Sequence, residues 1–196
     1  GVSGGGREFY GELITSREST LELSFPTAHV RTDVEAICRV HLAGSTGEAT
    51  KIKVEYGNNS ATSTVKPINV SDFYTKAEID SLTMFAKPVS SGAQKVKLQF
   101  ISGPQTANVY LNYVVLNVPC QLTMTGDVML ITNTSYLGDT PYMRFHLSGA
   151  TSETQIWRIT DGVNIEQMPT TTNEGVLTWV GNNNSAERYM AINPQG

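Results

Sequence analysis

The stretch Thr32–Gly44, "TDVEAICRVHLAG", decides the fold class because its apolar residues recur at every second position. An extended chain places alternate residues on opposite sides. One side is apolar throughout: Val34, Ala36, Cys38, Val40 and Leu42. The other side carries Glu35, Arg39 and His41, together with Ile37. This alternation predicts a β-strand with one face in a core and the other in solvent.

Three further segments repeat the alternation: "TLELSF" (Thr20–Phe25), "ATKIKVEYG" (Ala49–Gly57) and "AQKVKLQFI" (Ala93–Ile101). The segment "NVYLNYVVLNV" (Asn108–Val118) is different, because both of its sides are largely apolar. That pattern predicts a central strand covered on both faces. Pro119 lacks a backbone donor and is expected to end it.

Five shorter strands are predicted in the second half of the chain, over residues 128–132, 142–147, 155–159, 176–180 and 188–192. One segment remains ambiguous. Residues 71–87, "SDFYTKAEIDSLTMFAK", offer Ser71 or Asp72 as a helix cap and apolar residues three positions apart. A helix and a strand are both compatible with this pattern.

More than a dozen strand candidates separated by Gly-, Asn- and Pro-rich turns predict an all-β chain. The predicted fold is an antiparallel β-sandwich of the jelly-roll type over residues 1–119. Residues 120–196 are predicted either as a second, smaller β-unit packed on the first or as the continuation of one large sandwich.

The composition excludes two classes of partner. The net charge is −4 and no long Lys/Arg cluster occurs, so nucleic-acid binding is not expected. No apolar run approaches the roughly 20 residues that span a bilayer, so the chain is not expected to cross a membrane. The chain begins at Gly1 and ends at "NPQG", as expected of a fragment of a longer protein.

The glycines of "SGGGREFYGELI" (Ser3–Ile14) do not form a phosphate loop, because no Gly-Lys-Ser/Thr follows them. We expect a flexible lead-in over residues 3–6 and a strand over Arg7–Ile14. Phe9 and Tyr10 would face opposite sides of that strand, and Gly11 is expected at a bulge or a close backbone approach.

No catalytic or cofactor-binding motif is found. Cys38 and His41 lie three residues apart and therefore on opposite faces of a strand, so they cannot form a local dyad. His29, His41 and His146 are too scattered for a metal site, and no cofactor is expected. Burial as unpaired thiols is favoured over a disulfide for Cys38 and Cys120, although the disulfide alternative stays open.

Trp179 and Trp157 are the candidate contacts for a ligand or a partner, because an exposed indole can stack on a sugar or anchor an interface. The alternative for both is core packing, which Ile156 and Ile159 favour for Trp157.

Four stretches resemble a known family, and they occur in the expected order. "SGGGREFYGE" resembles the Ser-Gly-Arg-Glu-aromatic-aromatic-Gly-Glu stretch of PorU-like proteins, which are gingipain-type proteins of the type IX secretion system. "NVYLNYVVLNV" resembles their Gly-Tyr-Leu-Asp-Tyr-Ile strand. "QIWRITDGVNIEQM" (Gln155–Met168) and "AERYMAINPQG" (Ala186–Gly196) resemble two later stretches. The departures are Asn112 and Arg158, where Asp is usual, and Gly162, where Pro is usual.

The resemblance implies a β-rich region N-terminal to a cysteine peptidase domain, in a secreted protein of the bacterial outer surface. In that family the peptidase domain acts as a sortase on cargo proteins, and the catalytic Cys and His belong to it. No catalytic residue therefore transfers to this chain. The implied partners are the downstream peptidase domain, cargo and outer-membrane proteins. The resemblance also favours a strand over a helix in residues 71–87.

The function expected from the sequence is a non-catalytic β-sandwich module that positions the peptidase domain or contacts cargo or a partner. The alternative is a carbohydrate-binding or adhesive β-sandwich of another bacterial surface protein. A free-standing enzyme is the third reading, and the lack of a catalytic motif argues against it.

Overall fold

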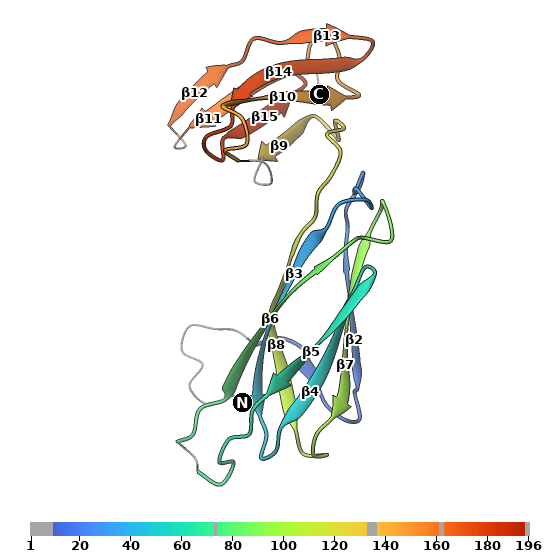
Figure 1. The fold of residues 1–196 in the computed structure, drawn as a ribbon, viewed down its shortest axis with the longest axis vertical. Helices are drawn as coiled ribbons and strands as arrows, with labels where there is room; N and C mark the ends of the chain where they lie inside the picture. The colour runs from blue at the N-terminus through green and yellow to red at the C-terminus, as the bar shows by residue number, and fades with distance from the viewer. Residues whose placement is uncertain (1–9, 73, 133–136, 161–162, 195–196) are drawn as a thin grey trace. The chain divides into compact units, whose positions relative to one another are not determined.

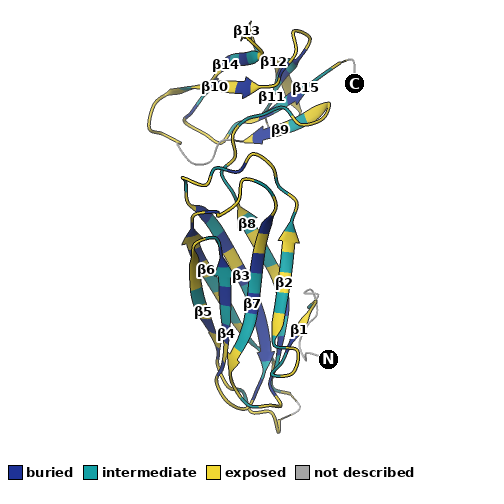
Figure 2. Cartoon of the chain, turned by 90° about the vertical axis from the view of Figure 1, so that its right-hand side faces the viewer, coloured by how far each residue is buried: buried dark blue, intermediate teal, exposed yellow. Residues whose placement is uncertain are grey.

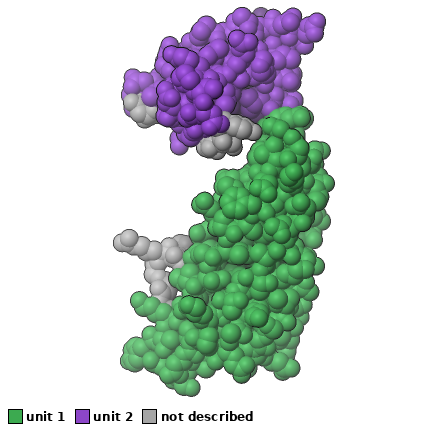
Figure 3. Space-filling model, viewed as in Figure 1, with its two compact units in different colours: residues 1–121 green, residues 122–196 purple. Residues whose placement is uncertain are grey.

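The computed structural model describes residues 10–72, 74–132, 137–160 and 163–194, and all regular structure in these ranges is β-strand. They contain no helix that could cross a bilayer. The chain divides into two compact units, residues 1–121 and residues 122–196 (Figure 3).

The first unit is built from eight strands: β1 (Leu13–Ile14), β2 (Thr20–Phe25), β3 (Ala36–Ser45), β4 (Thr50–Tyr56), β5 (Asn59–Val65), β6 (Glu78–Ala86), β7 (Gln94–Ser102) and β8 (Asn108–Asn117). Sheet A has the order β1-β8-β3-β6 and sheet B the order β2-β7-β4-β5 (Figure 1). Strand β1 pairs with β8, β2 with β7, β3 with β6 and β4 with β5, all antiparallel. The unit is therefore one long antiparallel hairpin rolled into two layers, which is a jelly roll. This confirms the predicted fold class.

The core of the first unit lies between the two sheets, as the alternation predicted (Figure 2). The inward row of β3 is at most 2% exposed, and so are the inward rows of β4 and β7 opposite it: Ala36, Cys38, Val40, Leu42, Ile52, Val54, Tyr56, Val96 and Leu98. Burial of one such aliphatic side chain contributes about 1.5–3 kcal/mol. These rows hold the two layers together.

The predicted coverage of both faces of Asn108–Val118 is wrong. Strand β8 has one neighbour on each side at its start, but its outer face is open, with Tyr113 47% and Val115 41% exposed. A bulge explains why both the odd-numbered and the even-numbered residues of this strand are largely apolar. The register jumps from Leu42↔Leu111 to His41↔Tyr113 and leaves Asn112 without a partner on β3. The inward-facing residues are therefore odd-numbered before the bulge and even-numbered after it.

The ambiguous segment contains a strand. Residues 78–86 form β6, with Met84 and Ala86 buried and Ile79 and Phe85 exposed, so the helix alternative is wrong and the strand is confirmed. Polar strands were missed. The sequence of β5, "NSATSTV", lacks an apolar alternation and therefore does not predict a strand.

The expected N-terminal strand is observed only as Leu13–Ile14, and its portion Arg7–Phe9 lies outside the described residues. The bulge expected at Gly11 is confirmed. Leu111 accepts a hydrogen bond from Gly11 N at 2.8 Å and donates one to Glu12 O at 2.9 Å, so two residues face one.

The second unit is built from seven strands: β9 (Val128–Thr132), β10 (Tyr142–Ser148), β11 (Gln155–Thr160), β12 (Asn164–Gln167), β13 (Thr171–Asn173), β14 (Val176–Asn182) and β15 (Arg188–Ile192). Sheet C has the order β10-β14-β13 and sheet D the order β12-β11-β15-β9. The five strands predicted in this half are confirmed. Strands β12 and β13 were not predicted, because only one of their seven residues, Ile165, is apolar.

The second core is centred on three aromatic side chains. Phe145 stacks on Trp179 with ring centroids 4.9 Å apart, and Tyr189 lies against both, at 5.2 Å and 5.7 Å. Gly181 makes room for this cluster. A Cβ atom at that position would lie 2.0 Å from Tyr189 Oη and 2.8 Å from Tyr189 Cζ.

We predict that one thiol reacts in the folded protein and two react after denaturation. Both cysteines are free thiols, but Cys38 is 0% exposed in the core and Cys120 is exposed. Titration with a thiol reagent, with and without denaturant, measures this directly. A single reactive thiol under denaturing, non-reducing conditions, or none, would contradict the structure.

We predict that Gly181→Ala destabilises the second unit by about 1–3 kcal/mol, the usual penalty for overpacking a core. Both tryptophans of the chain lie in this unit, so denaturation followed by tryptophan fluorescence reports on it selectively. Val180→Ala is the control, because Val180 is next to Gly181 on β14 but is 48% exposed, outside the aromatic cluster. Adding Tyr189→Phe removes the closest atom and should recover part of the loss; no recovery would show that another contact is responsible.

Candidate interaction surface

Cys38 and His41 do not form a catalytic dyad. Cys38 points into the core, and burial raises the pKa of its thiol to about 11, so it is protonated at neutral pH. His41 lies on the outer face of β3, where its ring stacks on Tyr113 with centroids 4.9 Å apart. The predicted separation of Cys38 and His41 on opposite faces is confirmed.

The histidines likewise lie apart from acidic partners. His41 Nδ1 is 3.2 Å from Asn112 Nδ2, and His146 Nδ1 is 3.2 Å from Thr178 Oγ1. Within the described ranges, no three His, Cys, Asp or Glu side chains are grouped closely enough to hold a metal ion.

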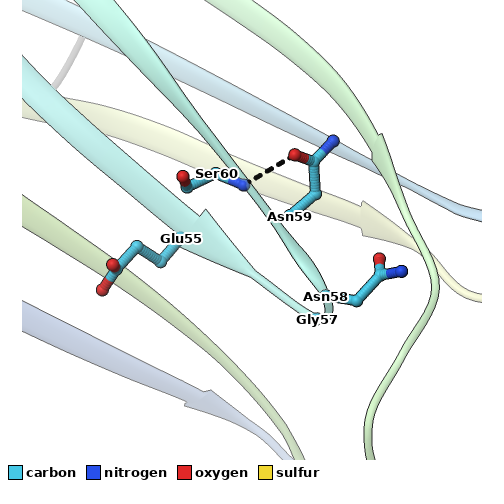
Figure 4. A pocket seen from close by; sticks show the side chains of 5 residues that line it. All are labelled: Glu55, Gly57, Asn58, Asn59 and Ser60. Carbon is cyan, nitrogen blue, oxygen red and sulfur yellow. Dashed lines mark hydrogen bonds between the residues drawn. The ribbon is translucent and has the colours of Figure 1, made fainter.

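A shallow polar hollow lies at the tip of the first hairpin, lined by Glu55 and Gly57–Ser60 (Figure 4). Its polar groups are used within the fold. Asn58 N donates to Lys87 O at 3.0 Å, Lys87 N donates to Asn58 Oδ1 at 2.9 Å, and Asn59 Nδ2 donates to Phe85 O at 2.9 Å. Gly57 has φ +57°, and a Cβ there would lie 2.2 Å from Lys87 O. The hollow is therefore the outside of a turn that ties sheet B to sheet A.

The outer faces of the four sheets differ in chemistry. Sheet B is charged, with Lys95 2.7 Å from Glu22 and Lys97 3.3 Å from Glu55. Sheet C interleaves its exposed Tyr142 and Val180 with Arg144, His146 and Thr178. Sheet A carries Ile79, Phe85, Tyr113 and Val115, interrupted by Arg39 and His41. Sheet D exposes Val128, Leu130 and Ile165.

The register of sheet D aligns its outward residues in three rows. One row runs Leu130–Met190–Trp157–Gln167, a second Val128–Ile192–Gln155, and a third Thr132–Arg188–Ile159–Ile165. Seven of these eleven side chains are apolar, and we call them the sheet D face: Val128, Leu130, Trp157, Ile159, Ile165, Met190 and Ile192.

The sheet D face is open to solvent. Leu130 is 71% exposed, and Val128 and Ile165 are each 57% exposed. At strand spacings of 4.7–4.9 Å and about 3.4 Å per residue, four strands of five residues cover on the order of 300 Å². An apolar patch of this size on a monomer often marks an interaction site.

The structure places the two candidate tryptophans differently. Trp157 lies at the centre of the sheet D face, partly exposed, and its Nε1 donates to Gln155 Oε1 at 3.2 Å. Trp179 is 1% exposed in the core, and its Nε1 has no hydrogen-bond partner within the described structure. A ligand contact stays a prediction for both, and only Trp157 has a ring at the surface.

Arg158 is held between two carboxylates at the edge of the second unit. It contacts Glu166 of β12, and its Nη1 lies 3.3 Å from Glu187 Oε1. Glu187 also accepts a hydrogen bond from the hydroxyl group of Tyr189. Burial together with this bond raises the pKa of the Tyr189 phenol. Asp at position 158, the residue usual in PorU-like proteins, would face two like charges here.

Sequence comparisons leave the chain unassigned, since neither a protein-family model nor a curated protein matches it. Solved structures do match. A crystal structure of dimeric latent PorU from Porphyromonas gingivalis superimposes with a TM-score of 0.78 at 16% sequence identity, covering 97% of this chain. This chain spans 19% of that PorU chain.

A cycloisomaltooligosaccharide glucanotransferase from Paenibacillus sp., solved with cycloisomaltoheptaose, matches with a TM-score of only 0.33 at 7% identity, which supports no argument. The first comparison shows a fold shared with part of PorU across nearly the whole chain.

Proposed function

We propose that this chain is a non-catalytic β-sandwich module of a secreted, cell-surface PorU-like protein, and that it binds protein through the sheet D face. The observation that carries the proposal is the exposed apolar face centred on Trp157, in a chain that shares a fold with part of PorU. The buried, protonated Cys38 supports a role other than cysteine catalysis.

The partner that we propose for the sheet D face is another domain of the same polypeptide, the peptidase domain in a PorU-like protein. About four fifths of the PorU chain lies outside the part that this chain matches. Domains of one chain meet through interfaces of about 600–1,500 Å². An apolar centre with Trp and Met and a polar rim suits such an interface, and Gln155, Gln167, Arg188 and Thr132 supply the rim.

We predict that Trp157 and Met190 are protected in the complete gene product and reactive in the fragment 1–196. Hydroxyl-radical footprinting measures both side chains in one experiment. Tyr142, 69% exposed on sheet C, is the internal control and should react equally in both proteins. Equal reactivity of Trp157 and Met190 in the two proteins would contradict docking through this face.

A matched pair of variants tests whether side-chain chemistry causes the protection. Leu130→Asp places a charge on the sheet D face, and Val180→Asp places one on the outer face of sheet C, where Val180 is 48% exposed. Protection of Trp157 should be lost in the first variant and kept in the second. A reading frame that stops after residue 196, or continues into a glycosidase domain, would contradict the PorU-like assignment itself.

The second candidate function is carbohydrate binding, and Trp157 is again the observation that favours it. The ring lies opposite Gln167 of β12 and donates to Gln155 of its own strand, so it provides a partly exposed stacking surface beside two amide groups. Under this alternative, Trp157→Ala abolishes binding on a glycan array and Tyr142→Ala does not. Absence of glycan binding by the unmodified fragment removes this candidate.

A further inference from the structure

The two layers of the first unit meet along two seams, and only one of them is closed. At the first seam, β5 packs against β6, and the Asn58, Asn59 and Ser63 side chains bond across it to Lys87, Phe85 and Asp80. At the second seam, β2 lies at the edge of sheet B, and β1 borders β8 at the edge of sheet A (Figures 1 and 2). We call this second edge the open seam.

Strand β1 covers only the first part of β8. It pairs Ile14 with Val109 and Leu13 with Tyr110, and the Gly11 and Glu12 bonds to Leu111 extend the ladder by one residue. Where β1 covers the open seam, the inward side chains are shielded from solvent: Ile14 and Val109 are 0% exposed and Leu111 is 4% exposed.

Beyond Asn112, the described structure contains no strand on this side of β8, and the inward residues are only partly buried. These are Val114, Leu116 and Val118, together with Leu21, Leu23 and Phe25 of β2, all of which contact the core. A full-length strand in the place of β1 would cover them.

Among the described residues, none pairs with the backbone of β8 on this edge beyond Asn112. In a strand, residues whose side chains share a face point their N–H and C=O groups toward the same edge. Leu111 is an inward residue, and both of its backbone groups bond to β1. Val114 and Leu116 are inward residues as well, so their backbone groups point to the same edge, where no described residue pairs with them. An extended strand can form backbone hydrogen bonds with such an edge and place its apolar side chains over the partly buried residues beside it.

The residues that precede β1 are a poor match for this site by sequence. Residues 3–8, "SGGGRE", contain no apolar side chain, so this stretch has no residues to cover the partly buried row of Val114 and Leu116.

We propose that the free edge of β8, Asn112–Asn117, binds an extended strand of another polypeptide. The added strand runs antiparallel to β8, as β1 does, and carries apolar side chains opposite Val114 and Leu116. This site lies in the first unit and does not depend on the sheet D face.

The test uses the chain 1–196 and a capped eight-residue peptide of alternating valine and threonine, with a lysine at each end for solubility. Titration followed by backbone amide NMR should shift the Val114 and Leu116 signals and slow their hydrogen exchange. The same peptide methylated on its backbone nitrogens keeps its side chains but cannot donate hydrogen bonds. It should bind at least about tenfold more weakly, since it loses the backbone hydrogen bonds that it would donate to β8.

Two matched variants are tested by the same NMR titration. Leu116→Ser removes an inward side chain at the open seam, and Val115→Ser removes its outward neighbour. We expect peptide affinity to fall roughly tenfold in the first and to change little in the second, since only the inward side chain of Leu116 would pack against the bound peptide. If Leu116→Ser does not fold, the methylated peptide on the unmodified chain decides the question.

Three results would overturn the proposal. The first is equal binding of the two peptides, and the second is no binding of either. The third is slow exchange of Val114 and Leu116 in the free protein, as slow as that of Leu111, because the edge would then already be occupied by the chain itself.

Discussion

The structure depends on one constraint: a strand with a single apolar side must bury that side against another element. Strand β3 shows it most clearly, because Ala36, Cys38, Val40 and Leu42 are all nearly inaccessible while Arg39 on the opposite side is exposed. Rolling the long hairpin satisfies the constraint for four strand pairs at once. The turn at Gly57–Asn58 is the tip of that hairpin, and its bonds to Lys87 fix where the roll closes.

The second unit satisfies the same constraint with larger side chains and fewer residues. Three packed rings fill a space that aliphatic rows fill in the first unit, and Gly181 is required because the ring of Tyr189 lies directly over the backbone of β14. The cluster ends at a polar rim, where Tyr189 donates to Glu187 and Glu187 contacts Arg158. The phenol is thus apolar on the inside and hydrogen-bonded at its tip, as a buried tyrosine requires.

The sequence predicted most strands because apolar alternation is a local property. It failed where the arrangement depends on distant residues. The bulge at Asn112 shifts the inward parity of β8, and a strand that is apolar on both sides gives no local sign of this. Strand β5 is polar and is placed by its hairpin turn rather than by its own composition.

The candidate site was predicted only in part, for the same reason. Trp157 and Trp179 are both flanked by apolar residues, and which of them points inward depends on sheet pairing. The sheet D face brings together residues from four strands, Val128 to Ile192 in sequence. No single stretch of sequence displays that face.

The two surfaces proposed for binding use different physics, and this difference separates their partners. The sheet D face offers side chains such as Leu130 and Trp157, so its partner must match it in shape and apolar area. The free edge of β8 offers backbone groups, so its partner needs an extended conformation and an alternating pattern more than a particular sequence. On sheet B, the edge strand β2 carries Glu22, which pairs with Lys95 of the neighbouring β7, so a charge lies at that edge and opposes such pairing. On β8, the equivalent outward positions carry Tyr113 and Val115, so the edge along which the described residues place no strand beyond Asn112 also lacks a charged outward residue.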